Sequence, residues 1–216
     1  MIRNWLESLL PGANPAFAGS ALLRVTRFVV FDTELTSLDR KTNRVLSLGA
    51  IAMRGPAIHL GDQFYRVVNP REEVPAESVL VHGLRPTDVA EGENPAAVIR
   101  DFHAFAENAV LVGHYVGIDV AALRKELQNP LRNPYLDTAR AVRWLRLQGE
   151  QLRGLDEVDE QLNLAALARR YGLEPSEAHH ALGDAFTTAQ LWQKLLLELE
   201  SHGITKLSQA LRIARG

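Results

Sequence analysis

Residues Val25 to Asp32 read VTRFVVFD, and the acidic continuation Thr33-Glu34-Leu35 follows directly. Because β-branched and aromatic residues fill this run, it predicts a buried β-strand. On an extended strand, residues two apart point to the same face, so Asp32 and Glu34 would present two carboxylates side by side. Burying two like charges is costly without compensation, and a divalent cation supplies that compensation. The alternative is that these strand-end acids only cap a neighbouring helix.

Two more strands are expected soon after the first. Arg44 to Met53 (RVLSLGAIAM) and Gly61 to Val68 (GDQFYRVV) are both rich in strand-forming residues. Asn69 and Pro70 end the second of these runs, because proline cannot continue a hydrogen-bonded strand. Polar breaks separate the three runs, which indicates an antiparallel meander.

The pattern then changes to helices that alternate with short strands. Asn94 is a candidate N-cap for the first helix, and Asn163 for a later one with the sequence LAALARRY. The expected elements are a helix over Pro95–Asn108, a strand over Val110–Val112, a helix over Ile118–Leu127, a strand over Tyr135–Asp137, a helix from Thr138 and a helix over His180–Leu199. Successive strands followed by alternating elements predict an α/β fold, in which helices flank a mixed sheet.

The ends of the chain are expected to be short extensions of one domain. Residues 1–22 are expected to form a loose leader or a short helix, before a domain over residues 23–200. Residues 201–216 are expected to form a short basic helix, with the cationic side chains Lys206, Arg212 and Arg215. This helix could touch nucleic acid, but the preferred interpretation is a solvated terminal helix.

The composition is that of an ordinary globular chain, with 216 residues, 46% of them hydrophobic and 23% charged. The absence of cysteine excludes disulfides, thiolate metal ligands and cysteine nucleophiles, and it fits a cytoplasmic location. No apolar run approaches the ~18 residues that span a bilayer, so no membrane segment is expected. The formal net charge of −2 argues against a non-specific grip on long duplex DNA, which requires a basic surplus. Any nucleic acid would therefore be bound locally, through a metal centre or in short stretches.

Two further motifs carry acids near the starts of expected helices. In VGHYVGID, residues 112–119, a short apolar strand leads into a helix whose first turn holds Asp119; a favourable contact with the helix dipole is the alternative explanation. In HHALGDA, residues 179–185, His179 and Asp184 are five residues apart, so both can reach one site if the helix begins near His180. Small apolar residues surround Asp184, which is unusual for a solvated charge, and His180 would then point elsewhere.

Taken together and in this order, the motifs resemble those of the DnaQ-like exonucleases, the DEDDh group of the ribonuclease H-like superfamily. The resemblance covers about residues 26–199. The family's first motif is D-x-E, its second is a His with an Asp five residues later, and its third repeats that spacing before an Ala. The matching residues are Asp32 and Glu34, His114 and Asp119, and His179, Asp184 and Ala185. The segment Val81-His82-Gly83-Leu84 is similar to the family's His-Gly-Ile loop, and Asp137-Thr138 to its later Asp-Thr.

The resemblance implies both a fold and an activity. The fold is a ribonuclease H-like mixed sheet of five strands, with a three-stranded antiparallel meander plus parallel strands, flanked by helices. The activity is that of a 3′→5′ exonuclease, which hydrolyses phosphodiester bonds with two metal ions and releases nucleoside 5′-monophosphates. Because the acids are all oxygen ligands, the ions are expected to be Mg²⁺ or Mn²⁺.

The resemblance also implies a role for each residue of the site. Asp32 would bridge both ions, and Glu34 and Asp184 would hold the ion on the side of the nucleophile. Asp119 would act mainly through water. His179 would be the general base for the attacking water, and histidine suits this role because imidazole is largely neutral near pH 7.

Contacts to the terminal nucleotide are expected from five other positions: Thr33, Leu35, Leu38, His82 and His114. Plain core packing is the alternative for both leucines, and a hydrogen-bonded turn is the alternative for His114.

The chain departs from the family pattern at several positions around the site. Leu35-Thr36-Ser37 stands where the family has Thr-Thr-Gly, Tyr115 replaces the Asn of the second motif, and Ile118 replaces its Phe. All four acids and the histidine remain. The departures therefore concern the choice of substrate more than the chemistry.

Three functions remain to be distinguished. A nuclease for single-stranded DNA with a free 3′ end is favoured, and an exoribonuclease or short-oligonucleotide nuclease of the same fold is the first alternative. A non-catalytic module that binds nucleic acid or a polymerase is the second, but it would have no chemical reason to keep the acids and the histidine. Because only about 17 residues follow the last core helix, only a weak link to a DNA polymerase is expected.

Overall fold

A five-stranded mixed sheet forms the centre of the computed structural model, which describes residues 19–126, 131–148, 162–174 and 179–215. The strand order is β3-β2-β1-β4-β5. The strands are β1 (Arg27–Leu35), β2 (Val45–Arg54), β3 (Ala57–Val67), β4 (Val110–Gly113) and β5 (Tyr135–Asp137). The first three pair antiparallel, whereas β4 pairs parallel with β1 and β5 pairs parallel with β4. The predicted antiparallel meander and parallel strands are confirmed.

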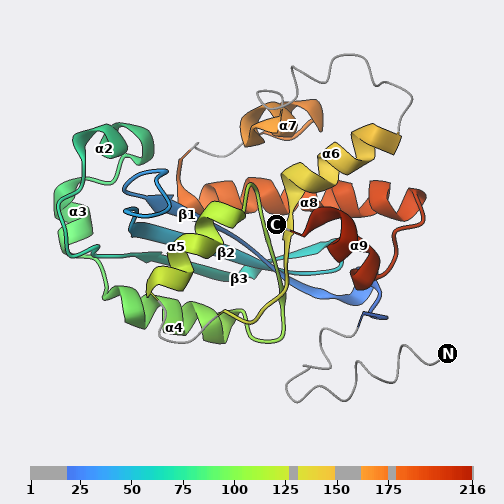
Figure 1. Ribbon diagram of the computed structural model, residues 1–216, viewed down its shortest axis with the longest axis horizontal. Coiled ribbons are helices and arrows are strands. Elements are labelled where there is room, and N and C mark those ends of the chain that lie inside the picture. The colour runs from blue at the N-terminus through green and yellow to red at the C-terminus, as the bar shows by residue number, and fades with distance from the viewer. Residues whose placement is uncertain (1–18, 127–130, 149–161, 175–178, 216) are drawn as a thin grey trace.

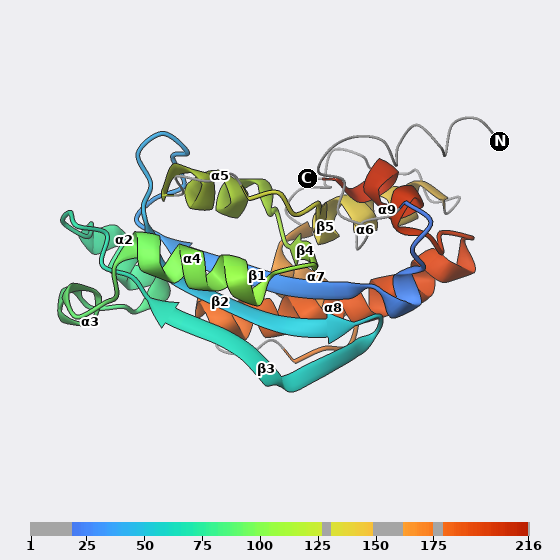
Figure 2. The same ribbon diagram turned by 90° about the horizontal axis from the view of Figure 1, so that it is seen from below.

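Helices cover both faces of this sheet (Figures 1 and 2). They are α2 (Ala76–His82), α3 (Pro86–Ala90), α4 (Pro95–Phe105), α5 (Gly117–Glu126), α6 (Thr138–Gln148), α7 (Leu164–Arg170), α8 (Ala181–Ser201) and α9 (Leu207–Ala214), after a 3₁₀ turn at Leu23–Val25. The long helix α8 crosses one face against β1 and β2, and α4 lies on the other face.

Alternate residues of β1 supply two separate cores. Phe28 and Val30 point into the core beneath α8, where the Phe28 ring meets Trp192 edge-on at 5.6 Å. Val29 and Phe31 point into the opposite core, which α4 and α5 close. Because both faces of the strand are buried, the sequence here is continuously apolar rather than alternating.

The expected N-caps are confirmed. The Asn94 side chain accepts from the Ala96 N–H at 3.0 Å, and the Asn163 side chain accepts from the Ala166 N–H at 2.8 Å. Both amides therefore satisfy donors that the first turn of a helix leaves open.

Two features differ from the sequence-based expectation. The short helices α2 and α3 were not predicted, because neither is long enough to show a helical apolar period. The expected solvated helix at the C-terminal end is instead part of the core: Leu207, Ala210 and Ala214 of α9 are buried, and α9 contacts α6 and β5. Their spacing of three and four residues places all three on one helix face.

Most of the expected leader lies outside the described residues, which begin at Gly19. Across the described part of the chain, no helix combines the length and the apolar character that crossing a membrane requires.

Candidate active site

The first two acids of the site lie at the end of β1, next to a glycine of β2. Asp32 pairs with Gly49 across the sheet. A Cβ on Gly49 would lie only 2.2 Å from the Leu182 backbone nitrogen, so the bare glycine lets the first turn of α8 rest directly on the strand. As a result Asp184, in that first turn, reaches the acids of β1. One carboxylate oxygen each from Asp32, Glu34 and Asp184 lies within 4.8 Å of the others.

The fourth acid, Asp119, comes from α5 on the other side of β1. Its Oδ1 atom accepts from the Thr33 hydroxyl at 2.5 Å and from the Thr33 N–H at 3.2 Å. The turn that leads into α5 is tight, because a Cβ on Gly113 would lie 2.7 Å from the Val116 side chain. Thr33 was expected to contact substrate, but its hydroxyl holds Asp119.

The four carboxyl groups perturb one another. Burial and the nearby charges of Asp119, Glu34 and Asp184 raise the pKa of Asp32 well above its usual range. Burial raises the pKa of Glu34 to about 7, with further contributions from Asp184 and Asp119. Burial also raises the pKa of Asp119 to about 7, against the opposing effect of the Thr33 hydrogen bond. A bound cation would offset the cost of ionising these buried, neighbouring carboxyl groups. A set of oxygen ligands fits Mg²⁺ or Mn²⁺.

His179 and His180 are adjacent in the sequence and directly precede α8. His179 has a φ of 64°, and its backbone N–H donates to Asp184 Oδ2 at 2.9 Å. His180 is the N-cap, where its Nδ1 accepts from the Gly183 N–H at 3.3 Å. The ring of His180 stacks on Tyr65 of β3 with 4.8 Å between centroids. Burial raises the pKa of Asp184, and the charges of both His179 and His180 oppose that rise, so both rings lie near this acid.

His82 lies close to His179, at the end of α2 rather than in a loop. Its Nδ1 accepts from the Leu84 N–H at 3.1 Å, so the proton of the neutral ring is on Nε2. Among the described residues, that buried Nε2 has no hydrogen-bond partner. Burial and the charge of His179 both lower the pKa of His82. The neutral ring thus offers one donor beside the site.

His114 and the two leucines occupy different environments. His114 Nδ1 lies 2.8 Å from the Thr138 hydroxyl, and burial lowers its pKa to about 4, so a neutral ring braces the turn after β4. Leu35 packs against the core under α4, whereas Leu38 is 78% exposed in the loop between β1 and β2. Of these three, the exposed Leu38 is the one open to a ligand.

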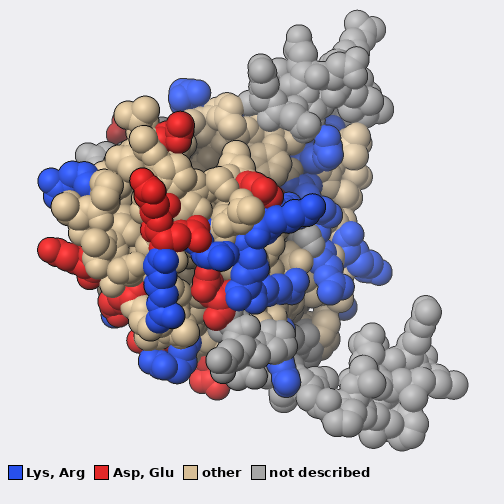
Figure 3. Space-filling model, turned by 60° about the vertical axis from the view of Figure 1, so that its left-hand side comes forward, with Lys and Arg blue, Asp and Glu red and all other residues tan. Residues whose placement is uncertain are grey.

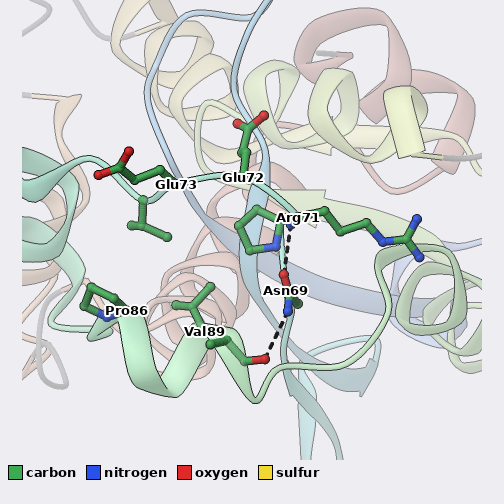
Figure 4. A pocket seen from close by; sticks show the side chains of 9 residues that line it. Asn69, Arg71, Glu72, Glu73, Pro86 and Val89 are labelled. Carbon is green, nitrogen blue, oxygen red and sulfur yellow. Dashed lines mark hydrogen bonds between the residues drawn. The ribbon is translucent and has the colours of Figure 1, made fainter.

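A surface pocket lies apart from the acids (Figure 4). It lies between the segment after β3 and helix α3, with Glu72 and Glu73 in its lining. The Asn69 side chain links the segment after β3 to α3, because it donates to the Ala90 carbonyl at 3.0 Å and accepts from the Arg71 N–H at 2.9 Å. None of the four acids lines this pocket.

Comparison with known proteins agrees with the geometry of the acids. Residues 29–192, well over half of the chain, match the RNase T family, which is described as an exonuclease family. The chain belongs to this exonuclease family. It is 35% identical over 212 residues to a DNA polymerase III subunit epsilon-like protein of Rhodobacter capsulatus, covering 94% of the chain and 28% of that relative. It is 30% identical to a PolC-type DNA polymerase III of Thermotoga maritima, covering 84% of the chain and 13% of that relative.

Solved structures share the fold of this chain. Escherichia coli exonuclease I, in complex with a dT13 oligonucleotide, superposes with a TM-score of 0.70 at 20% identity, over 82% of this chain and 42% of that one. Cell-death related nuclease 4 superposes with a TM-score of 0.64 at 16% identity, over 84% of this chain and 66% of that one. The chain spans only part of the curated relatives, 28% of the first one's length and 13% of the second's.

Three residues of the candidate site were not identified from the sequence: Ser47, Gly49 and Tyr65. Tyr65 pairs with Gly49 across the β2–β3 ladder, and its ring carries the stacked His180. Burial raises the pKa of Tyr65, the neighbouring Ser47 hydroxyl lowers it, and the charge of Glu34 raises it further. Ser47 in turn pairs with Glu34. Ser47 and Gly49 are two residues apart, as are Asp32 and Glu34, so each pair lies on one face of its strand. Only the register of the sheet shows that the two pairs lie opposite each other.

Proposed function

We propose that this chain is a metal-dependent 3′→5′ exonuclease that acts on single-stranded 3′ ends, with DNA preferred, and releases nucleoside 5′-monophosphates. One observation carries the proposal: the carboxylates of Asp32, Glu34 and Asp184 converge from two elements, with His179 bonded to Asp184. Burial raises the pKa values of these acids, and the charges of neighbouring acids add to the rise for Asp32 and Glu34, which favours a catalytic site over a structural one.

The acids are assigned as the metal site. Asp32, Glu34 and Asp184 would hold divalent cations, and Asp119 would act mainly through water; two Mg²⁺ or Mn²⁺ ions are proposed. Bound there, such cations supply an activated water at neutral pH and neutralise charge on the phosphate. Thr33 fixes Asp119 so that its second carboxylate oxygen remains available to the site.

The protein side chains then orient the substrate and move a proton. His179 accepts the proton of the attacking water. Its backbone N–H donates to Asp184, which places this residue beside the proposed metal site. His82 Nε2–H is a donor for the terminal nucleotide, and Leu38 offers an apolar surface to its base. Leu35 supports the site by packing against the core, and His114 supports it by bracing the turn after β4.

The preference for DNA and any polymerase partner rest on the relatives. The exonuclease I structure with dT13 supports DNA, while an exoribonuclease or short-oligonucleotide nuclease remains the second candidate. The polymerase III relatives support at most a weak polymerase link. We assign residues 23–200 to the exonuclease unit, with α9 packed onto it. The cytoplasmic location stays a prediction.

The direct test is digestion of DNA and RNA strands labelled at the 3′ or 5′ end, with Mg²⁺, Mn²⁺ or EDTA. We expect stepwise loss from the 3′ end that EDTA and Asp119→Ala abolish, and a DNA rate above the RNA rate. His179→Ala should lower kcat by roughly 10²–10⁴-fold, the usual contribution of a general base. The matched control is His202→Ala, an exposed histidine at the far end of α8. A ladder from the 5′ end, or full activity in Asp119→Ala, would contradict the proposal.

A further inference from the structure

Tyr115 occupies the turn between β4 and α5, close to the acids. Its φ of 51° lies in the left-handed region, which residues other than Gly, Asn and Asp rarely adopt. Two hydrogen bonds hold it there: its N–H donates to Asp137 Oδ1 at 3.3 Å, and its carbonyl accepts from the Ile118 N–H at 3.2 Å. A bulky residue at such a position costs stability, which points to a functional use.

The ring of Tyr115 is presented to solvent. It is 41% exposed, it meets the His114 ring edge-on at 4.8 Å, and it belongs to neither core of the described residues. Because His114 is braced by Thr138, the ring rests on a rigid support. The aromatic ring is therefore supported on the turn that leads into α5, four residues before Asp119 in the sequence.

Two exposed arginines flank this turn. Arg40 Nη2 lies 3.4 Å from where a Cβ on Gly117 would be, two residues beyond Tyr115. Arg140 donates its N–H to Asp137 Oδ1 at 3.4 Å, and the same oxygen accepts from the Tyr115 N–H. Burial raises the pKa of Asp137, and the charge of Arg140 opposes that rise. The loop with Arg40 and helix α5 lie toward the side of Figure 1 that comes forward in Figure 3, where Lys and Arg side chains gather in a band.

We propose that Tyr115 is a stacking platform for one base of a single strand, upstream of the bond that is cut, with Arg40 and Arg140 binding phosphates on either side. This inference rests on the proposed exonuclease function and deepens it. Aromatic rings stack on any base without reading its sequence, and guanidinium groups suit phosphates. Because a base within a duplex is stacked and paired already, such a platform favours single-stranded substrates.

The test couples removal of the ring to removal of a base. A deoxythymidine decamer is compared with decamers that carry a single abasic site, moved through the four positions upstream of the 3′-terminal nucleotide. Tyr115→Ala should raise KM on the intact strand by about tenfold, the scale of one base stacked on a ring. On the strand that lacks the stacked base, the same substitution should change KM by less than about twofold, because the contact is already lost.

Two other substitutions separate stacking from backbone strain. Tyr115→Phe keeps the ring and should keep KM. Tyr115→Asn removes the ring but tolerates the left-handed backbone, so its Tm should be at least that of the wild type while KM rises as in Tyr115→Ala. A structural role would instead make the loss of activity follow the loss of stability.

The arginines have their own readout. Arg40→Gln and Arg140→Gln should each reduce the slope of log KM against log salt by roughly 0.7, the value for one phosphate contact of a single strand. Arg212→Gln, an exposed arginine on α9, is the matched control and should leave the slope unchanged. Equal KM values for wild type and Tyr115→Ala on every strand would overturn the platform alone. A wild-type protein that shortens no strand with either metal would instead overturn the proposed exonuclease function.

Discussion

At the scale of single residues, Thr33 shows how an acid is held in place without a cation. Its hydroxyl donates to Asp119 Oδ1, while Asp119 carries a pKa raised to about 7 by burial. We expect Thr33→Val, which keeps the shape and removes the hydroxyl, to destabilise the protein by about 1–2 kcal/mol. It should also weaken metal activation by roughly tenfold, as loss of a partner to a metal ligand usually does. Thermal unfolding and kcat against Mn²⁺ concentration measure both effects.

Thr33→Ser is the matched control for that prediction, because it keeps the donor and should behave as wild type. A Thr33→Val protein with wild-type metal dependence would show that the hydroxyl has no part in placing Asp119.

The sequence could predict the acids but not the residues that hold them. Asp32 and Glu34 follow from the period of a strand, and the spacing from His179 to Asp184 follows from a helical turn. Thr33 and Asp119, by contrast, are 86 residues apart. A local pattern records which face a side chain takes, whereas its partner across the fold depends on how distant elements pack.

At the scale of elements, the close approach of α8 to β2 decides whether Asp184 reaches the site. Gly49→Ala would place a Cβ 2.2 Å from the Leu182 backbone nitrogen, and backbone cannot move aside as a flexible side chain can. We expect a loss of about 1–3 kcal/mol in the free energy of unfolding, the usual cost of overpacking. Metal affinity should fall as well, because α8 is pushed away from Asp32 and Glu34. Denaturant unfolding and metal titration by calorimetry report the two losses.

Gly61→Ala is the control within the same sheet, since no heavy atom lies within 4 Å of a Cβ there. It should change stability by less than about 0.5 kcal/mol. Equal stability and metal affinity in both variants would mean that α8 does not depend on the bare strand at Gly49.

The strands and the long helices were predicted well, whereas the short helices α2 and α3 were not. The expected strand at Tyr135–Asp137 is β5 itself, and the expected His180–Leu199 helix is α8 within two residues. Strand β3 begins at Ala57 rather than at Gly61. A register shift between Ile51 and Ala52 of β2 lets the first residues of β3 pair with the end of β2. Helix α2 has no side-chain cap and exposes Leu80 and Val81, so it carried none of the signals that mark a helix from sequence.

At the scale of the whole molecule, burial of the acids links folding to pH and metal. Glu34 and Asp119 have folded pKa values of about 7, above their ordinary values of 4.5 and 3.8. Raised pKa values of this kind add stability that is complete below the ordinary values and is lost as the pH rises through 7. We therefore expect the Tm in EDTA to fall between pH 6 and 8. Mg²⁺ or Mn²⁺ should raise the Tm more at pH 8 than at pH 6, because the metal binds the deprotonated acids.

The pH window matters because His114 acts in the opposite sense. Burial lowers its pKa to about 4 from 6.5, so its contribution to stability is lost as the pH falls through that range. Scans in EDTA between pH 6 and 8 isolate the acids from most of this effect. Glu34→Gln, which cannot ionise, should flatten the fall of Tm and reduce the response to metal. A Tm in EDTA that is constant from pH 6 to 8, with the same metal response at both, would mean that burial and neighbouring charges do not raise the pKa values of Glu34 and Asp119 in the folded protein.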